Sequence, residues 1–190
     1  MPFAKKCRIA LVNLSKSLML GGLTRPVNVA VGAAFRNESY EVVAGERASW
    51  IQGYHLTSDS SDIAQGGSSV FQGFAPSDAG KNSRTNVGAY LDLETNLSDA
   101  LLANIATRVE SYSDFGQAFT GKAAVRWQPD PKFVMRGALS TGFRAPGLQQ
   151  SWYSHTTTAI QNSVLIEIGN FPVTNRASRI FGARPLEGEK

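Results

Sequence analysis

The feature that most constrains this chain is an alternation of apolar and polar residues, with a period of two, between Arg84 and Arg144. Four stretches show it, and in each the two charged residues share one alternate set, opposite the apolar set. These pairs are Asp92 and Glu94, Arg108 and Glu110, Lys122 and Arg126, and Arg136 and Arg144. Chance alone would keep all four pairs together about once in sixteen, so the pattern predicts strands with one apolar face.

Turn-forming residues separate the four stretches. Ser98 and Asp99 lie in the first gap, Asp114 and Gly116 in the second, and a Pro-Asp-Pro-Lys sequence at 129–132 in the third. Asp and Ser side chains bond to nearby backbone, Pro removes a donor, and Gly permits positive φ. Four strands joined in series by short turns predict an antiparallel meander.

Two further strands are predicted before this segment, the second of them marked by alternating valines at 27–31. The predicted fold is therefore all-β, an antiparallel meander of about six strands. We place these strands near residues 8–20, 27–42, 84–97, 101–113, 118–128 and 132–144. Residues 43–83 and 145–190 show no period and are predicted as long loops on the same side of the sheet.

Two architectures could use such a sheet. A soluble sandwich buries the apolar face, whereas a transmembrane barrel turns that face to lipid and the polar face to a water-filled lumen. Strands of about 10–12 residues suit a tilted bilayer crossing. Aromatic residues such as Tyr112, Phe119 and Trp127 lie near strand ends, and the apolar set is rich in Ala and Gly. These features favour a partial transmembrane β-barrel with extracellular loops at 43–83 and 145–190.

Composition and motifs argue against several functions. The net charge of +4 is scattered along the 190 residues, so no nucleic-acid partner is predicted. Cys7 is the single cysteine, which excludes an internal disulfide. No catalytic triad, phosphate loop or metal-binding spacing occurs. The chain is predicted not to be an enzyme, to bind no metal and to need no cofactor.

Two groups of residues are candidates for contact with a solute. Charged residues of the polar set would line a lumen, where most would pair with one another or with a plug. They are Arg108, Glu110, Lys122, Arg126, Arg136 and Arg144. Trp152 and Tyr153 stand beside polar residues and could hold a ligand by stacking and hydrogen bonding. Packing within the loop is the alternative interpretation of these two aromatic residues.

Three stretches of the chain resemble the barrel of TonB-dependent outer-membrane receptors. They are residues 90–94, residues 108–116 with 121–122, and residues 140–150. The most specific is Gly142 to Pro146, which is similar to the Gly-Phe-Arg-Ala-Pro sequence that recurs in this family where a barrel strand enters an outer loop. Gly147 follows, where the family often has Ser. The resemblance extends from about Gly22 to the C-terminus.

The resemblance implies a plugged barrel of about 22 strands in the outer membrane. Such a receptor takes up a scarce solute with energy passed from the inner membrane through the TonB protein. Its partners are then outer-membrane lipid, a plug domain, TonB and a small solute whose identity is unknown. With about six strands and no plug domain or TonB-contacting sequence, this chain is expected to be an internal fragment of the barrel domain that does not function alone.

Two other functions remain open on the sequence alone. A passive, porin-like outer-membrane channel segment would also alternate in this way. A soluble β-sandwich binding module would need the Ala-rich and Gly-rich apolar set to form a packed core.

The isolated 190-residue chain is predicted to aggregate without detergent, because its sheet has unpaired edges and one apolar face. Size-exclusion chromatography and thermal melting, with and without detergent, would measure this. A soluble monomer that melts cooperatively in buffer would support the sandwich instead.

Overall fold

The structure is a computed structural model that describes residues 3–21, 25–56, 63–64, 66–67, 72–161 and 164–189. Side chains are described for these residues except at 158–161 and 164–165. Parts of the predicted loop 43–83 therefore lie outside the described residues.

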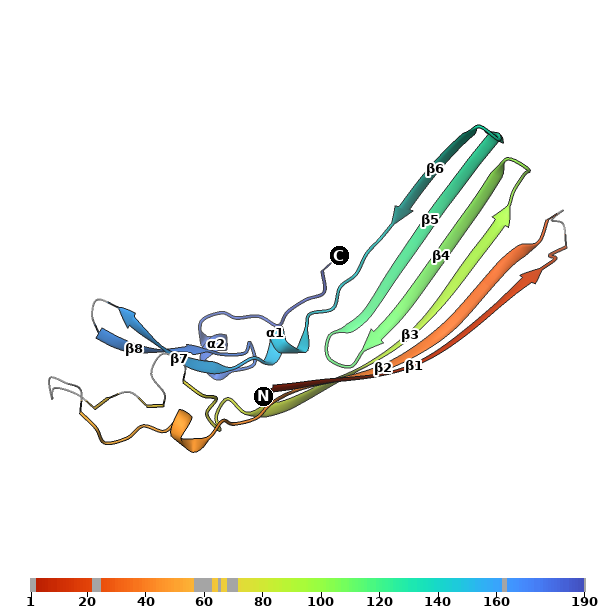
Figure 1. Cartoon of the computed structure of the whole chain (residues 1–190). Coiled ribbons are helices and arrows are strands. Elements are labelled where there is room, and N and C mark those ends of the chain that lie inside the picture. The colour runs from red at the N-terminus through yellow and green to blue at the C-terminus, as the bar shows by residue number, and fades with distance from the viewer. Residues whose placement is uncertain are drawn as a thin grey trace. The chain divides into compact units, whose positions relative to one another are not determined.

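Six long strands form one antiparallel sheet in chain order, which confirms the predicted all-β meander (Figure 1). They are β1 Phe3–Leu18, β2 Val27–Val42, β3 Gly80–Asn96, β4 Leu101–Tyr112, β5 Gly116–Asp130 and β6 Phe133–Ser140. In the order of the sheet, β1 and β6 are the two outer strands, so the sheet is open. No helix in the described part of the chain is long and apolar enough to cross a membrane.

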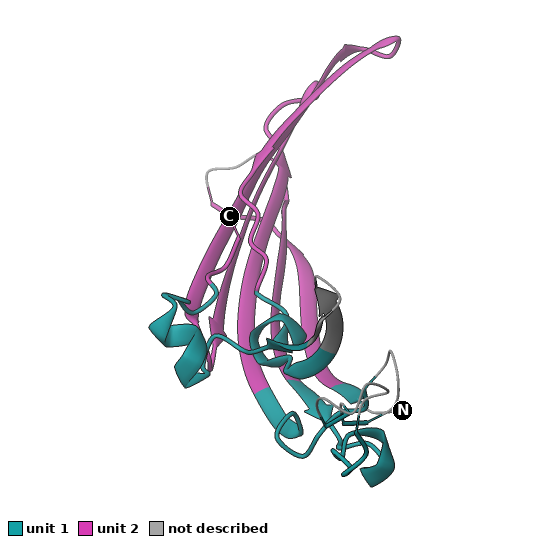
Figure 2. Cartoon of the chain, turned by 90° about the vertical axis from the view of Figure 1, so that its left-hand side faces the viewer, with its two compact units in different colours: residues 1–6, 38–83, 146–186 teal, residues 7–37, 84–145, 187–190 magenta. Residues whose placement is uncertain are grey.

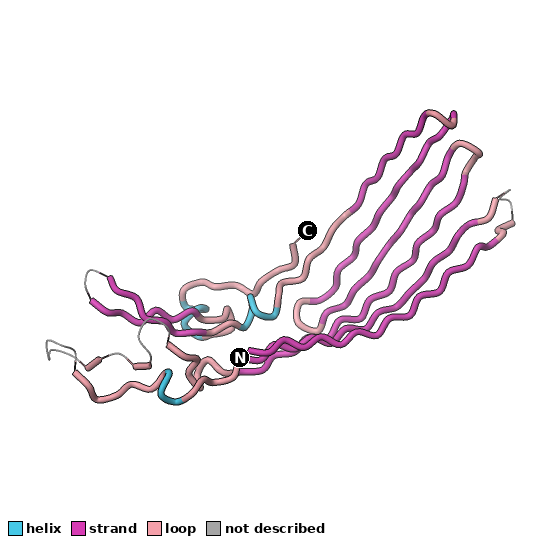
Figure 3. The backbone as a smooth tube through the Cα atoms, in the orientation of Figure 1, coloured by secondary structure: helices cyan, strands magenta, loops and turns pink. Residues whose placement is uncertain are grey.

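The segment predicted as a loop at 145–190 contains regular structure, which corrects that prediction (Figure 3). It holds a two-stranded hairpin, β7 His155–Gln161 and β8 Val164–Asn170, and two helical turns, α1 Leu148–Trp152 and α2 Arg176–Ile180. A third helical turn, η1 Arg47–Ser49, lies between β2 and β3. Threonines in β7 and β-branched residues in β8 favour the extended backbone.

Several strand ends differ from their predicted positions; β3, for example, begins at Gly80 rather than at residue 84. The first strand begins at Phe3 rather than near residue 8, and β6 ends at Ser140 rather than at residue 144. Beyond Ser140, the Thr141 amide still donates to the Gly121 carbonyl at 2.9 Å, but the Gly121 amide donates to the Thr141 side chain. A side chain thus takes the place of the next backbone partner, and the regular ladder stops there.

The register of β3 to β6 sorts the side chains onto two faces. Ile105 on β4 pairs with Leu93 and with Ala123, and Ala123 pairs with Leu139 on β6. Since paired residues share a face, these side chains belong to the apolar face. It is largely exposed: Leu139 is 82% exposed and Ile105 is 62% exposed. Their sequence neighbours all stand on the opposite, polar face.

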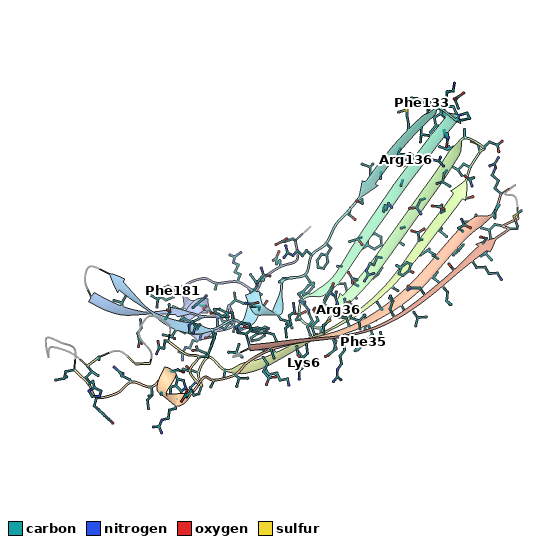
Figure 4. All side chains as sticks on the ribbon, in the orientation of Figure 1. Lys6, Phe35, Arg36, Phe133, Arg136 and Phe181 are labelled. Atoms are coloured by element: carbon teal, nitrogen blue, oxygen red, sulfur yellow. The ribbon has the colours of Figure 1, made fainter. Side chains whose placement is uncertain are left out.

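The same alternation extends to β2. Phe35 and Arg36 are consecutive on this strand and project to opposite faces (Figure 4). Phe35 is largely exposed, as an apolar residue outside any packed core must be.

The chain divides into two compact units (Figure 2). Unit 1 comprises residues 1–6, 38–83 and 146–186, and unit 2 comprises residues 7–37, 84–145 and 187–190. In unit 1 a small core forms around Tyr40, Val42 and Leu148, with Phe74 and Trp152 packed against it. Among the described residues no large side chain is fully buried. The sheet therefore has no enclosed hydrophobic core of its own.

An aromatic cluster in unit 2 joins the start of β3 to the turn between β4 and β5. Tyr112 and Phe115 stack with ring centroids 4.3 Å apart, and Phe143 lies within 6 Å of both. The Arg84 guanidinium lies 5.5 Å from the Tyr112 ring and 3.5 Å from the Asp114 carboxylate. Cation–π attraction and an ion pair thus hold a largely buried arginine in place.

Gly32→Ala is expected to destabilise the sheet by about 1–3 kcal/mol through overpacking. A Cβ at Gly32 on β2 would lie 2.6 Å from the side-chain oxygen Oδ1 of Asn13 and 2.8 Å from Tyr90 Cζ. It would displace the Tyr90 hydroxyl, which donates to that oxygen at 2.8 Å. The free energy of unfolding of the full receptor, measured by urea titration in lipid vesicles, tests this.

Gly121→Ala on β5 is the matched control. Both glycines lie inside strands, and neither is among the positive-φ glycines of the described chain. The nearest atom to a Cβ at Gly121 is 3.8 Å away, so the cost should stay within about 0.5 kcal/mol. Equal costs for the two substitutions would contradict the close packing at Gly32.

Candidate functional site

The polar face of unit 2 carries most of the charged residues predicted to meet a solute. Arg108 and Glu110 stand two residues apart on β4, and the guanidinium donates to the carboxylate at 2.8 Å. On β3, Asp92 accepts a 2.8 Å hydrogen bond from the Asn104 amide, and Tyr90 reaches Asn13 on β1. The first bond lies within β4, the second joins the neighbouring strands β3 and β4, and the third crosses β2 to join β3 to β1.

A concavity of about 660 Å³ lies over β3 to β6 of unit 2. Three of the predicted residues line it: Lys122 and Arg126 on β5, and Arg136 on β6 near the β5–β6 turn (Figure 4). Small residues, Ala124 and Ala138, stand between the charged residues on the same face. The structure therefore brings these three cations together, as strand alternation alone would suggest.

The prediction that Arg144 joins this polar face is wrong. Arg144 lies beyond the end of β6 and forms an isolated antiparallel bridge with Glu189, with two backbone hydrogen bonds of 3.0 Å. Its side chain is 77% exposed and approaches the Glu189 carboxylate at 3.9 Å. Gly142 and Pro146 flank this residue and disfavour a continuing strand. The prediction missed this because the alternation of apolar and polar residues continues as far as Arg144.

The two aromatic residues proposed as ligand contacts have different environments in unit 1. Tyr153 packs edge-on against Phe74 with centroids 6.2 Å apart, and His155 lies 4.5 Å from Phe74. The Tyr153 ring is therefore engaged in loop packing. Trp152 ends α1, packs against the small core of unit 1 and lines a cavity of about 230 Å³.

This small cavity contains a polar centre that the sequence did not reveal. Asp78 lines it and is only 6% exposed. One carboxylate oxygen accepts the Ser154 hydroxyl at 3.0 Å, and the other accepts the Ala75 amide at 3.2 Å. Ser154 and Asp78 are 76 positions apart, so no local pattern could have paired them.

The chemistry of the cavity suits a small polar molecule. Further lining residues supply hydroxyl and amide groups from three segments: Ser77, Asn82, Thr174 and Asn175. An indole ring beside such groups can stack on an apolar face of a ligand while the polar groups orient it. Within the described part of the chain, no group of three or more His, Cys, Asp or Glu side chains could hold a metal.

Comparison with known proteins gave one family. Residues 20–187 match the family model described as TonB dependent receptor-like, beta-barrel. Comparison with curated proteins gave no match, and comparison with solved structures gave none. The matched range covers the charged candidate residues on β4 to β6 and the small cavity, and it confirms the resemblance inferred from the Gly142 to Pro146 sequence.

Asp78→Ala is expected to loosen the wall of the small cavity. It would leave the Ser154 hydroxyl and the Ala75 amide without their acceptor in a buried setting, at a cost of about 1–3 kcal/mol. Hydrogen exchange of the amides in 74–79 and 153–155, followed by mass spectrometry, should accelerate accordingly.

Asp130→Ala provides the control. Asp130 also accepts a backbone amide in a turn, that of Lys132 at 2.8 Å, but there it is exposed to water. Exchange near residues 130–132 should change little, because water replaces the lost acceptor. Similar acceleration in both variants would show that Asp78 is no more than an ordinary turn residue.

Proposed function

This chain belongs to the TonB-dependent receptor-like β-barrel family, and we propose that it forms one part of a receptor for energised uptake of a scarce solute. Barrel domains of this family are outer-membrane proteins, and the family serves transport rather than catalysis. In the intact receptor the partners are outer-membrane lipid, a plug domain, the TonB protein and a small solute.

The observation that carries this proposal is the sorting of side chains by strand register. Ile105, Phe119 and Leu139 stand on one face and are each more than half exposed. Water would solvate this surface at a cost of about 25 cal/mol per Å², whereas lipid removes that cost. The opposite face carries the charged residues and would line an aqueous lumen.

The open sheet supports the view that this chain alone does not transport. Strands β1 and β6 are the outer strands of the sheet, and each has a backbone edge. An unpaired backbone group in hydrocarbon costs several kcal/mol, so further strands must close the barrel in a membrane. We place residues 43–83 and 145–190 on the extracellular side, where barrel loops are long.

Two sets of residues are proposed to meet the solute. On the lumen face they are Arg108, Glu110, Lys122, Arg126 and Arg136. In the extracellular part, Trp152 is the stronger candidate because it lines the 230 Å³ cavity, whereas the ring of Tyr153 packs against Phe74.

Ala123→Arg and Ala124→Arg test the assignment of the two faces. The residues are consecutive on β5, but Ala123 pairs with Ile105 and Leu139, whereas Ala124 pairs with Asn104 and Ala138. A charge on the lipid face near the midplane costs about 2–4 kcal/mol, so Ala123→Arg should destabilise the receptor by that amount. Ala124→Arg should cost much less because its side chain enters water.

The measurement is the free energy of unfolding of the full receptor in lipid vesicles. Leu139→Arg and Ala138→Arg on β6 form a second pair with the same expected order. If the penalties are equal within each pair, or reversed, the apolar face does not contact lipid and the proposed function loses its support.

A further inference from the structure

Three cationic side chains gather on the polar face of unit 2, at the strands β5 and β6. Arg126 and Arg136 are directly opposed in the register of these strands, and Lys122 stands on the same face of β5. Like charges directly opposite each other on a sheet are destabilising. An anion bound between these side chains would relieve their mutual repulsion.

The structure supplies no such anion from the described residues. None of the ion pairs found among them involves Lys122, Arg126 or Arg136. A terminal nitrogen of Arg126 donates to the neutral Gln128 side chain, while Arg126 Nε is buried and has no acceptor in the described part of the chain.

The acidic residues that line the same concavity form no ion pair with these cations in the described structure. Asp92 and Glu94 are on β3, which is separated from β5 by β4. Neighbouring strands lie about 4.8 Å apart, so this separation is about 10 Å. Asp92 is moreover engaged by the Asn104 amide at 2.8 Å. The concavity thus has an acidic side and a basic side.

We propose that Lys122, Arg126 and Arg136 form a binding site for a free anion that carries a carboxylate or phosphate group. Guanidinium groups donate two parallel hydrogen bonds to such groups, and an ammonium adds a third point of charge. Ala124 and Ala138 leave room between the cations, in a concavity of about 660 Å³. This inference rests on the proposed function in one respect, namely that the polar face is wet.

Thiol modification in the full receptor tests the site. In a background without other cysteines, including Cys7→Ser, a cysteine is placed at Ala124 beside the three cations or at Ala30. The concavity at Ala30 is lined by two acidic residues, Asp92 and Glu94, and one basic residue, Lys16. Each variant reacts with an anionic and a cationic methanethiosulfonate at low ionic strength. The readout is the ratio of the two rate constants, anionic over cationic.

The ratio at position 124 should exceed that at position 30 by about tenfold, because a cationic cleft concentrates anions. Arg126→Gln together with Arg136→Gln should remove most of this difference. Inorganic phosphate or acetate, exchanged for chloride at constant ionic strength, should slow the anionic reagent at position 124 and not at position 30. Whichever of the two protects identifies the chemistry that binds.

Three outcomes would overturn the site. Equal ratios at two reactive cysteines would mean that another part of the receptor neutralises the cations. A high ratio without protection by phosphate or acetate would mean that the positive potential of this face attracts anions but that no defined site binds them. If neither Ala124→Cys nor Ala138→Cys, placed directly opposite, reacts in a folded receptor, solute does not reach the cations and the site fails, whereas the Ala123 and Ala124 pair tests the proposed function separately.

Discussion

The antiparallel register of β3 to β6 is the constraint on which the rest of this structure depends. Side chains alternate between faces at every residue, so a shift by one position would carry every apolar side chain to the polar face. The pairing of Ile105 with Leu93 and Ala123 aligns the apolar residues of β3, β4 and β5, and the pairing of Ala123 with Leu139 adds β6. Short turns, and the contacts of Arg84 with Tyr112 and Asp114, stabilise this register at the strand ends. One apolar surface and one charged surface result.

These two surfaces explain why a membrane receptor fits this chain better than a soluble domain. The apolar face has no layer packed upon it in the described structure, and the sheet has open edges. Both features are costly in water and are relieved when further strands close a barrel in lipid. The polar face is then enclosed, where the separation of Asp92 and Glu94 from the cations of β5 and β6 creates a local field.

Unit 1 depends on a different kind of interaction, contacts between residues far apart in the chain. Asp78 binds Ser154, and Phe74 packs against Tyr153 and His155. These contacts join the segment before β3 to the segment after β6. They help to form the small polar cavity beside Trp152, whose lining also includes Val42 at the end of β2 and Asn82 near the start of β3. The lining residues that lie outside the strands, such as Ser77 and Thr174, can change without disturbing the sheet.

By itself the sequence determined the six-stranded meander and the two-faced strands, because alternation and turn chemistry are local properties of the chain. The turn at Gly116, where φ is 100°, is one such local signal. Only the tertiary structure decided that Arg126 opposes Arg136, that Arg144 pairs with Glu189, and that 155–170 forms a hairpin. Those features depend on which distant residues meet. A period of two fixes which face a side chain takes, but it leaves the register of two segments open in steps of two residues.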